Sequence, residues 1–464
     1  MQHVAKPLTV VGAGYVGLVS GACLAAIGHR VTVVDRDDRK IAGLRVGHIP
    51  IYEAGLAELV ASETAAGRLS FSTDLAEAVP RAAAVFICVG TPPRPSDGHA
   101  DMGQVMAAAG AIAPHLAAGT IVVVKSTVPV GTGDEVEALI RSRTATGGIA
   151  VVSNPEFLRE GVAIADFMRP DRVVVGTEDS RAAAMMAALY QPLTERGAPL
   201  LVTDRRAAEL IKYAANSFLA LKITYINEIA NLCEEIGADV GDVARGIGLD
   251  PRIGAQFLKA GPGFGGSCFP KDMLALMKTG QDHGVPLRSV ETAVAVNDAR
   301  KGEMVRKIVR AAGGSVAGRR IAVLGLTFKA GTDDMRSAAS LVILPQLQKQ
   351  GARVTAFDPA GMAEAAPLLP GVAMAESAMT VLAGADLAVI LTEWPEFAAL
   401  DLAAAARAMR SPVLVDLRNL LDPEAAARAG FLYRSVGRAA RAAAARRAVP
   451  HAPAQTVLPV LELS

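Results

Sequence analysis

The sequence is poor in the residues that build disulfide or zinc frameworks. Its 464 residues include only four cysteines, Cys23, Cys88, Cys233 and Cys268, which lie far apart and form no C-x-x-C pair. This spacing excludes a disulfide framework and a zinc site. The seven histidines are scattered as well, so no metal site is predicted. Free thiols of this kind are typical of a reducing cytoplasm.

An excess of charge and long apolar runs are also missing. The formal net charge is +1, which gives no support for a nucleic-acid partner or a strongly acidic one. No uninterrupted apolar stretch is long enough to span a membrane. The apolar run 16–27 follows an expected strand and contains glycines, so it is not interpreted as a signal sequence. We therefore expect a soluble, cytoplasmic protein, whose 51% apolar residues are enough for sizeable cores.

Short apolar runs alternate with helical patterns in the first part of the chain. Runs rich in Val and Ile, bounded by Gly, Pro, Asp or Ser, predict buried parallel strands of a doubly wound α/β domain. The expected strands are 8–11, 31–34, 85–89, 121–124, 149–152, 173–175 and 200–202.

The pattern then becomes helical and later returns to α/β. A helix is expected over 207–236, which contains neither Gly nor Pro, and a second helical stretch runs from 273 to about 312. Further strands are expected at 321–324, 354–357, 387–391 and 413–415. The predicted architecture is two Rossmann-like doubly wound domains joined by a central helical domain with a long helix. We expect these domains at 1–204, 205–312 and 313–437, followed by an Ala/Arg/Pro-rich tail at 438–464, interpreted as a solvated terminus rather than a binding arm.

A glycine-rich turn lies between the first expected strand and the helix that follows it. The residues Gly12-Ala13-Gly14-Tyr15-Val16-Gly17 have the spacing G-x-G-x-x-G. The first glycine permits a tight turn, the second lets the backbone approach a pyrophosphate, and the third lets helix and strand pack closely. The helix N-terminus then offers amide hydrogens to the phosphates.

A carboxylate at the end of the second expected strand strengthens this interpretation. Asp35 has the offset of a residue that binds a ribose 2′-hydroxyl, and its charge disfavours the 2′-phosphate of NADP. An ordinary glycine turn near a strand-end aspartate is the alternative. Together the two features predict NAD binding, and the segment 88–92, which contains Thr91, is expected to border the same crevice.

The segment 261–272, with the sequence GPGFGGSCFPKD, predicts a reactive thiol. Glycines at this density cost conformational entropy, so they are expected where backbone passes close to a ligand. Cys268 ends this loop, with Lys271 and Asp272 nearby, and is predicted to be a nucleophile. The other three cysteines are expected to be packing residues.

Further polar residues stand where site residues are expected, although their spacing leaves two interpretations. Lys212 and Asn216 are four apart on the long helix and share a face. They are either part of a solvated stripe or a cation and an amide donor aimed at a developing oxyanion. Glu156 and Glu160, which follow a strand, either cap and form ion pairs or belong to a site. Thr127 also stands at a strand end, where α/β sites usually form.

Several motifs, occurring in order, resemble those of the UDP-glucose/GDP-mannose dehydrogenase family. They are GAGYVGL at 12–18, PIYEAGL at 50–56, KSTVPVGT at 125–132, NPEFLREG at 154–161, FGGSCFPKD at 264–272 and GLTFKAGTDDMR at 325–336. The resemblance extends from Leu8 to about Leu421, and the cysteine motif is its most specific part. Ala54 departs from the family pattern, which has proline there. The region of Arg418 matches a substrate-binding segment imperfectly.

The resemblance implies an activity. It is the NAD-dependent four-electron oxidation of UDP-glucose at C6 to UDP-glucuronate, with two NAD and one water, through a thiohemiacetal and a thioester on Cys268. The first domain would bind NAD, the central domain would form a homodimer or larger homo-oligomer, and the third would bind the UDP-sugar. The alternatives are another sugar nucleotide, such as UDP-N-acetylmannosamine or GDP-mannose, a non-catalytic NAD-binding regulator, and a two-electron dehydrogenase of the 6-phosphogluconate type.

The resemblance also implies roles for matched positions. Lys212 and Asn216 would stabilise oxyanions. Asp272 would act with an ordered water as a base, held by Thr127 and Glu156, although the group that takes the first proton is left open. The implied cofactor contacts are Gly12, Gly14, Tyr15, Val16, Gly17, Asp35, Lys40, Thr91, Thr127, Glu160, Lys271 and Arg336. The implied substrate contacts are Glu156, Phe157, Leu158, Arg159, Glu160, Lys212, Asn216, Lys259, Phe264, Gly265, Phe328, Lys329, Arg418 and, from a neighbouring subunit, Arg252.

Overall fold

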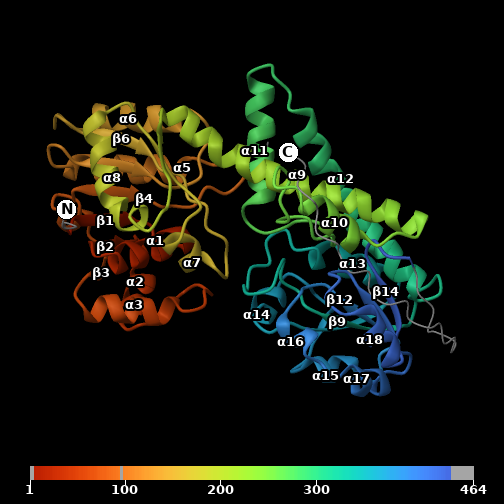
Figure 1. The fold of residues 1–464 in the computed structure, drawn as a ribbon. Coiled ribbons are helices and arrows are strands. Elements are labelled where there is room, and N and C mark those ends of the chain that lie inside the picture. The colour runs from red at the N-terminus through yellow and green to blue at the C-terminus, as the bar shows by residue number, and fades with distance from the viewer. Residues whose placement is uncertain (1–4, 95–97, 440–464) are drawn as a thin grey trace, which may run out of the picture.

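A computed structural model of the protein describes residues 5–94 and 98–439, so most of the expected tail, residues 440–464, lies outside the described residues. Figure 1 shows two α/β lobes with a layer of helices between them. The N-terminal lobe runs from red to yellow, the central helices are mostly green, and the C-terminal lobe runs from teal to blue. Within the described residues, no helix has the length and apolar character needed to cross a membrane.

The N-terminal lobe is built on an eight-stranded sheet with the order β3-β2-β1-β4-β5-β6-β7-β8. Its strands are β1 (Pro7–Val11), β2 (Arg30–Val34), β3 (Leu69–Ser72), β4 (Ala84–Ile87), β5 (Ile121–Val124), β6 (Ala150–Ser153), β7 (Val173–Gly176) and β8 (Leu200–Thr203). Its helices are α1 (Tyr15–Ala26), α2 (Asp38–Arg45), α3 (Leu56–Ala65), α4 (Leu75–Ala78), α5 (Gly103–Ile112), η1 (Ala113–His115), α6 (Thr132–Arg143), α7 (Ala163–Met168) and α8 (Ser180–Thr194). From β3 the chain returns to the centre of the sheet and adds β4 beside β1. The strand order therefore reverses between β1 and β4, and the carboxyl ends of these two strands form a crevice.

The strand pattern differs from the expected one at the edges of this sheet. The expected strand 200–202 is not buried, because β8 is the edge strand and Leu201 and Val202 are 47% and 45% exposed. The expectation of an all-parallel sheet was also wrong, since β7 pairs with β6 in antiparallel direction at Ser153 and Gly176. Strand β3 was missed because its alternating sequence, LSFS, lacks the continuous apolar run of a central strand.

The central layer consists of α9 (Arg205–Ile236), α10 (Val240–Gly248), α11 (Phe269–Asp282) and α12 (Arg288–Ala311). Helix α9 begins two residues before the expected start, because the side chain of Asp204 caps it by accepting the N–H of Ala207. It has 32 residues, which makes it about 48 Å long at 1.5 Å per residue. This length carries it from the first sheet into the central layer (Figure 1).

The second expected helical stretch is two helices rather than one. Helix α11 ends at Asp282, and Gly284 then takes a left-handed φ of 69°, which favours glycine and interrupts the helix. The chain resumes as α12 at Arg288. Helices α11 and α12 both pack against α9.

The C-terminal lobe has a six-stranded parallel sheet with the order β11-β10-β9-β12-β13-β14. Its strands are β9 (Arg320–Leu324), β10 (Arg353–Phe357), β11 (Ala373–Met374), β12 (Leu387–Ile390), β13 (Val413–Asp416) and β14 (Leu432–Ser435). Its helices are α13 (Ser340–Lys349), α14 (Met362–Ala365), α15 (Ala378–Leu382), α16 (Pro395–Ala398), α17 (Leu402–Ala408) and α18 (Pro423–Arg428). The short edge strand β11 and the more polar β14 were missed by the sequence pattern.

Both sheets therefore follow the doubly wound architecture predicted from the sequence. We propose that the three domains meet at 204/205 and 312/313, because each of these limits falls between two secondary-structure elements. The first lies between the end of β8 and the start of α9, and the second between the end of α12 and the start of β9.

Candidate active site

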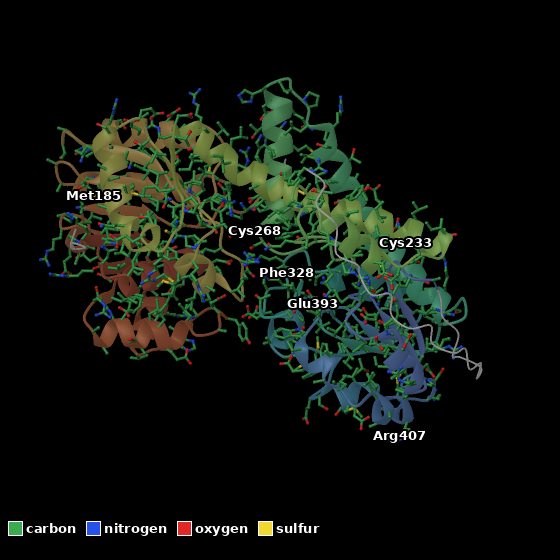
Figure 2. The ribbon with its side chains drawn as sticks, in the orientation of Figure 1. Met185, Cys233, Cys268, Phe328, Glu393 and Arg407 are labelled. Carbon is green, nitrogen blue, oxygen red and sulfur yellow. The ribbon has the colours of Figure 1, made fainter. Side chains whose placement is uncertain are left out.

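A cavity of about 510 Å³ lies where the two lobes meet the central helices. Its walls come from the loop after β6, from α9, from the loop before α11 and from the C-terminal lobe. In Figure 2, Cys268 lies at this junction with Phe328 and Glu393 nearby, whereas Cys233 lies away from it among the central helices. The cavity volume falls in the range typical of small-molecule sites.

The glycine-rich loop passes so close to the C-terminal lobe that side chains would not fit. A Cβ atom on Gly265 would lie 2.4 Å from the carbonyl oxygen of Ser337, and one on Gly266 would lie 2.7 Å from the ring of Phe328. Gly266 also has a left-handed φ of 83°. Glycine is therefore required at both positions by close packing against the second lobe.

Side chains of α9 and α12 hold the backbone at the start of this loop. The amide of Asn297 accepts the N–H of Phe264 at 2.8 Å and donates to its carbonyl at 3.1 Å. The N–H of Gly261 donates to Asn227, and its carbonyl accepts from Arg300, whose side chain is 2% exposed. Because these contacts pair buried backbone groups, they fix the path of the chain toward Cys268.

Cys268 directly precedes α11 and lines the cavity. Burial raises the pKa of its thiol, and the carboxylates of Glu156 and Asp272 act in the same direction, whereas the ammonium of Lys212 lowers it. The position at a helix N-terminus also favours a thiolate. In contrast, Cys23 and Cys88 lie in the core of the first lobe, and burial raises the pKa of each to about 12.

Lys212 and Glu156 form a buried ion pair next to this thiol. The Lys212 ammonium lies 3.1 Å from a Glu156 oxygen, and the two side chains are 3% and 5% exposed. Burial alone would lower the pKa of Lys212, but Glu156, Cys268 and Asp272 outweigh it and raise the pKa. Lys212 is therefore held as a cation at the cavity wall, and the interpretation as a solvated stripe is wrong.

A second set of buried polar contacts surrounds Asp272. Its carboxylate, in a side chain that is 1% exposed, accepts from the amide of Asn216 at 2.6 Å and from Lys271 at 2.7 Å. The Lys271 ammonium also lies 3.5 Å from the hydroxyl of Thr91, in the loop after β4. Asp272 and Lys271 do not line the large cavity, although Cys268 does.

Thr127 does not line the large cavity but shares a smaller one with Lys212. Both residues line a second cavity of about 10 Å³, together with Glu209 and Ser153. That volume is close to the smallest that holds one water molecule. Glu209 accepts the N–H groups of Gly131 and Gly133 and so fixes the turn that follows Thr127.

The C-terminal lobe reaches the site through Phe328, Lys329 and Arg418. Lys329 donates to the carbonyl of Glu160 at 2.6 Å. The Glu160 carboxylate accepts from Ser267 at 3.0 Å and from Arg336 at 3.1 Å. Burial raises the pKa of Glu160, as does Asp334, against the opposing effect of Arg336. Glu160 therefore joins the loop after β6, the residue before Cys268 and the C-terminal lobe.

Most of the residues expected to contact substrate line the large cavity. They are Glu156, Phe157, Leu158, Arg159, Glu160, Lys212, Asn216, Lys259, Phe264, Gly265, Phe328, Lys329 and Arg418. Arg418 donates to the carbonyls of Leu391 and Phe328, which places it at the wall despite its imperfect motif. Arg252 is different, because its side chain is 87% exposed, pairs with Asp250 and does not line the cavity of its own chain.

Other lining residues were not singled out from the sequence. Lys125, Asn154 and Ser267 lie within the quoted motifs, so their position in those motifs was the available signal. Arg172 had no such signal. Its guanidinium lies 3.7 Å from the centre of the Phe157 ring and stacks on that face.

The turn between β1 and α1 fits a dinucleotide. Gly12 has a left-handed φ of 106°, and a Cβ atom on Gly17 would lie 1.8 Å from the carbonyl oxygen of Gly12. The position of a Cβ on Gly14 is open, which leaves room for a phosphate to approach. Asp35 accepts the N–H of Ala13 at 2.8 Å and lies 3.2 Å from the Lys40 ammonium. Burial opposes ionisation of Asp35, but these donors outweigh it and lower its pKa.

Comparisons with known proteins agree with these features. Residues 6–194, 206–299 and 322–423 match the NAD binding, central and UDP binding domains of the UDP-glucose/GDP-mannose dehydrogenase family. The chain is 57% identical to a protein of Rhizobium meliloti (strain 1021) named UDP-glucose 6-dehydrogenase, over 93% of this chain and 99% of that one. It is 46% identical to UDP-glucose 6-dehydrogenase TuaD of Bacillus subtilis (strain 168), over 94% of both chains. The solved structure of a UDP-glucose dehydrogenase from Pyrobaculum islandicum has a TM-score of 0.86 and 39% identity, over 94% of this chain and 99% of that one.

The environment of Cys268 predicts how its reactivity depends on pH. Lys212→Met removes the ammonium that opposes the effect of burial and leaves Glu156 unpaired, so the pKa of the thiol should rise further. Since only the thiolate reacts, the midpoint of the pH dependence of Cys268 alkylation by iodoacetamide should move to higher pH. The alkylation rate at neutral pH should be about tenfold lower. Peptide mass spectrometry of the labelled enzyme measures this rate. Lys278→Met, at a partly exposed position of α11, is the control. An unchanged or lower midpoint for Lys212→Met would contradict the assignment.

Proposed function

The chain belongs to the UDP-glucose/GDP-mannose dehydrogenase family, and we propose that it oxidises C6 of UDP-glucose to the carboxylate of UDP-glucuronate. NAD is its cofactor. The observation that carries the proposal is the meeting of a thiol, a buried ammonium and a buried amide, from Cys268, Lys212 and Asn216, at the wall of one cavity. Relatives that match over nearly the full chain are named for the same reaction.

The first oxidation converts the C6 alcohol to an aldehyde. NAD, when bound, supplies the chemistry of hydride acceptance in both oxidations. As the hydride leaves C6, the hydroxyl proton passes to a base of the site and then to solvent, so one proton is released for each hydride transferred. Lys212 and Asn216 donate to the oxygen, where negative charge develops, and such donors contribute about 3–4 kcal/mol to lowering a barrier. Both side chains are buried, which strengthens their interaction with the developing charge.

Cys268 then keeps the aldehyde on the enzyme. The thiol of Cys268 gives up its proton as its sulfur forms a bond to C6, and the carbonyl oxygen takes up one proton, which gives a thiohemiacetal. This adduct has a hydrogen on C6 that a second oxidation removes, so the product is a thioester of Cys268. A free aldehyde would instead be released from the site.

Hydrolysis of the thioester completes the reaction. A water attacks C6, the bond from C6 to sulfur breaks, and the thiol of Cys268 is restored with the uronate as product. Asp272 accepts the proton of that water, and Thr127 and Glu156 help to hold the water in place. Over the whole cycle, one alcohol and one water give one carboxylate, and four electrons leave as two hydrides.

Two groups of residues bind the ligands in this proposal. The sugar nucleotide is held by the backbone and side chains of residues 156–160, together with Lys259, Phe264, Phe328, Lys329 and Arg418. The cofactor is held by Gly12, Gly14, Tyr15, Val16, Gly17, Asp35, Lys40, Thr91, Thr127, Glu160, Lys271 and Arg336.

The stoichiometry tests the proposed reaction. We expect about two NADH for each UDP-glucose consumed, because the thioester route removes four electrons. NADH absorbance and chromatography of the nucleotide products measure the ratio. A parallel panel of UDP-N-acetylmannosamine and GDP-mannose controls for substrate identity. One NADH per sugar, or turnover confined to GDP-mannose, would contradict the proposal.

We further propose that the protein is a homodimer joined through α9. Phe218, Tyr225 and Leu232 of this helix are spaced seven apart and are 63%, 53% and 53% exposed. Apolar side chains at this spacing form a continuous stripe on one helix face. Leu249 and Arg252 lie in the segment after α10, beside α9, because Lys222 of α9 donates to the carbonyl of Ile253. In the dimer, Arg252 reaches the cavity of the partner.

Mixing two inactive variants tests this arrangement. Cys268→Ala and Arg252→Ala should each lose activity, but a mixed dimer contains one site with both residues intact. Co-refolded or co-expressed in equal amounts, the pair should recover about a quarter of wild-type activity, because half of the dimers are mixed. Purified enzymes are assayed for NADH formation. If Arg252 served its own chain, no mixed dimer would have an intact site and no activity would return.

A further inference from the structure

The carboxylate of Glu53, in the segment between α2 and α3, has no role in the proposed chemistry. Its residue is 8% exposed. One oxygen accepts the N–H of Ala163 at 2.7 Å, and the other accepts the N–H of Gly161 at 2.6 Å and the hydroxyl of Tyr15. Among the described residues, the side chains and amides that donate to Glu53 here are two backbone N–H groups and one phenol, all of them neutral. A buried carboxylate is costly without strong hydrogen bonds, so its position is fixed by these groups.

One of these donors belongs to the cofactor turn. Tyr15 stands between Gly14 and Gly17 at the start of α1, so its backbone lies where a pyrophosphate would bind. Its side chain reaches away from that backbone to Glu53 and also accepts the N–H of Gly161 at 3.2 Å. Burial and the hydrogen bond to Glu53 raise the pKa of the Tyr15 phenol, so it stays a donor at any physiological pH.

The other two donors are Gly161, at the end of the loop that lines the large cavity, and Ala163, the first residue of α7. Gly161 has a left-handed φ of 82°, and a Cβ there would lie 2.5 Å from the carbonyl oxygen of Gly331. The loop is therefore pressed against the C-terminal lobe at this residue. Its neighbour Glu160 contacts Ser267, which directly precedes Cys268, and receives Lys329 on its carbonyl.

We propose that Glu53 is a positioning residue that couples cofactor binding to sugar binding through Tyr15 and Gly161. A dinucleotide on the Gly12–Gly17 turn orders the Tyr15 backbone, and the phenol then holds Glu53. Glu53 in turn orders Gly161 and Glu160 before the sugar arrives. Each ligand orders the same contacts, so the second one to bind meets a smaller entropic cost, and the coupling is positive and reciprocal. The choice of UDP-glucose as the sugar nucleotide rests on the proposed function.

Tyr15→Phe removes the hydroxyl and leaves Glu53 bonded to both amides. Calorimetric titration of the full-length enzyme with UDP-glucose, alone and with saturating NADH, measures the coupling without turnover, because NADH cannot oxidise the sugar. We expect NADH to tighten UDP-glucose binding by roughly fivefold or more in the wild type, which is the usual range of coupling. In Tyr15→Phe the ratio of the affinity for UDP-glucose with NADH to that without NADH should fall to about one. Glu53→Gln should lower the ratio too and also weaken UDP-glucose binding without NADH, because an amide offers one acceptor oxygen for two N–H groups.

Tyr52→Phe is the matched control, since Tyr52 precedes Glu53 and is 44% exposed. Its ratio should equal that of the wild type. A wild-type ratio in Tyr15→Phe, or no coupling in the wild type, would overturn the proposal.

Hydrogen exchange separates this proposal from the proposed substrate. NADH alone should slow exchange of the Gly161 and Ala163 amides in the wild type and not in Tyr15→Phe. This measurement needs no sugar. If NADH protects the Gly161 and Ala163 amides as expected but UDP-glucose does not bind, only the proposed function is contradicted. Equal protection in the two proteins would contradict the coupling.

Discussion

The site depends on one ion pair, between Lys212 and Glu156, from which water is nearly excluded. Such a pair gives little net stability, because desolvation offsets its attraction, yet removing one partner typically costs about 3–5 kcal/mol. Its value to the molecule is therefore positional. It keeps an ammonium charged beside Cys268, where burial alone would make both the cation and a thiolate unfavourable. In the proposed reaction, the same charge would stabilise the oxyanion that forms on C6. In the proposed reaction, this one buried cation would serve both the thiol and the developing alkoxide, because Glu156 keeps it in place.

The fold supplies this pair from two elements that are distant in sequence. Glu156 follows β6 at the carboxyl edge of the first sheet, and Lys212 lies within α9, which leaves that sheet for the central layer. The C-terminal lobe closes the cavity from the other side, where Phe328 fills the space left by Gly266. Glu160 holds the three parts together through Ser267, Arg336 and the carbonyl contact with Lys329. The arrangement explains why Gly265 and Gly266 are needed for packing against the C-terminal lobe.

The sequence predicted the features that local spacing encodes. The turn at Gly12–Gly17, the buried strands, the long helix and the exceptional position of Cys268 each follow from residues close together in the chain. Features that depend on distant partners were not predictable in this way. The exposure of β8 depends on its place at the sheet edge, and the break at Gly284 was hidden within an otherwise helical pattern. The bond from Gly161 to Glu53 spans 108 positions, and that from Phe264 to Asn297 spans 33. For Lys212 and Asn216, spacing left two interpretations, and only their burial chose between them.

The central claim is that the sugar is covalently bound to Cys268 during turnover. Mass spectrometry of enzyme quenched in acid while it oxidises UDP-glucose tests this most directly, with digestion to find the modified peptide. We expect the peptide containing Cys268 to gain the mass of UDP-glucuronate less one water, and we expect Cys268→Ser to form no thioester. A wild-type enzyme that produces uronate at full rate with this peptide unmodified at every quench time, or with the adduct on another cysteine, would contradict it.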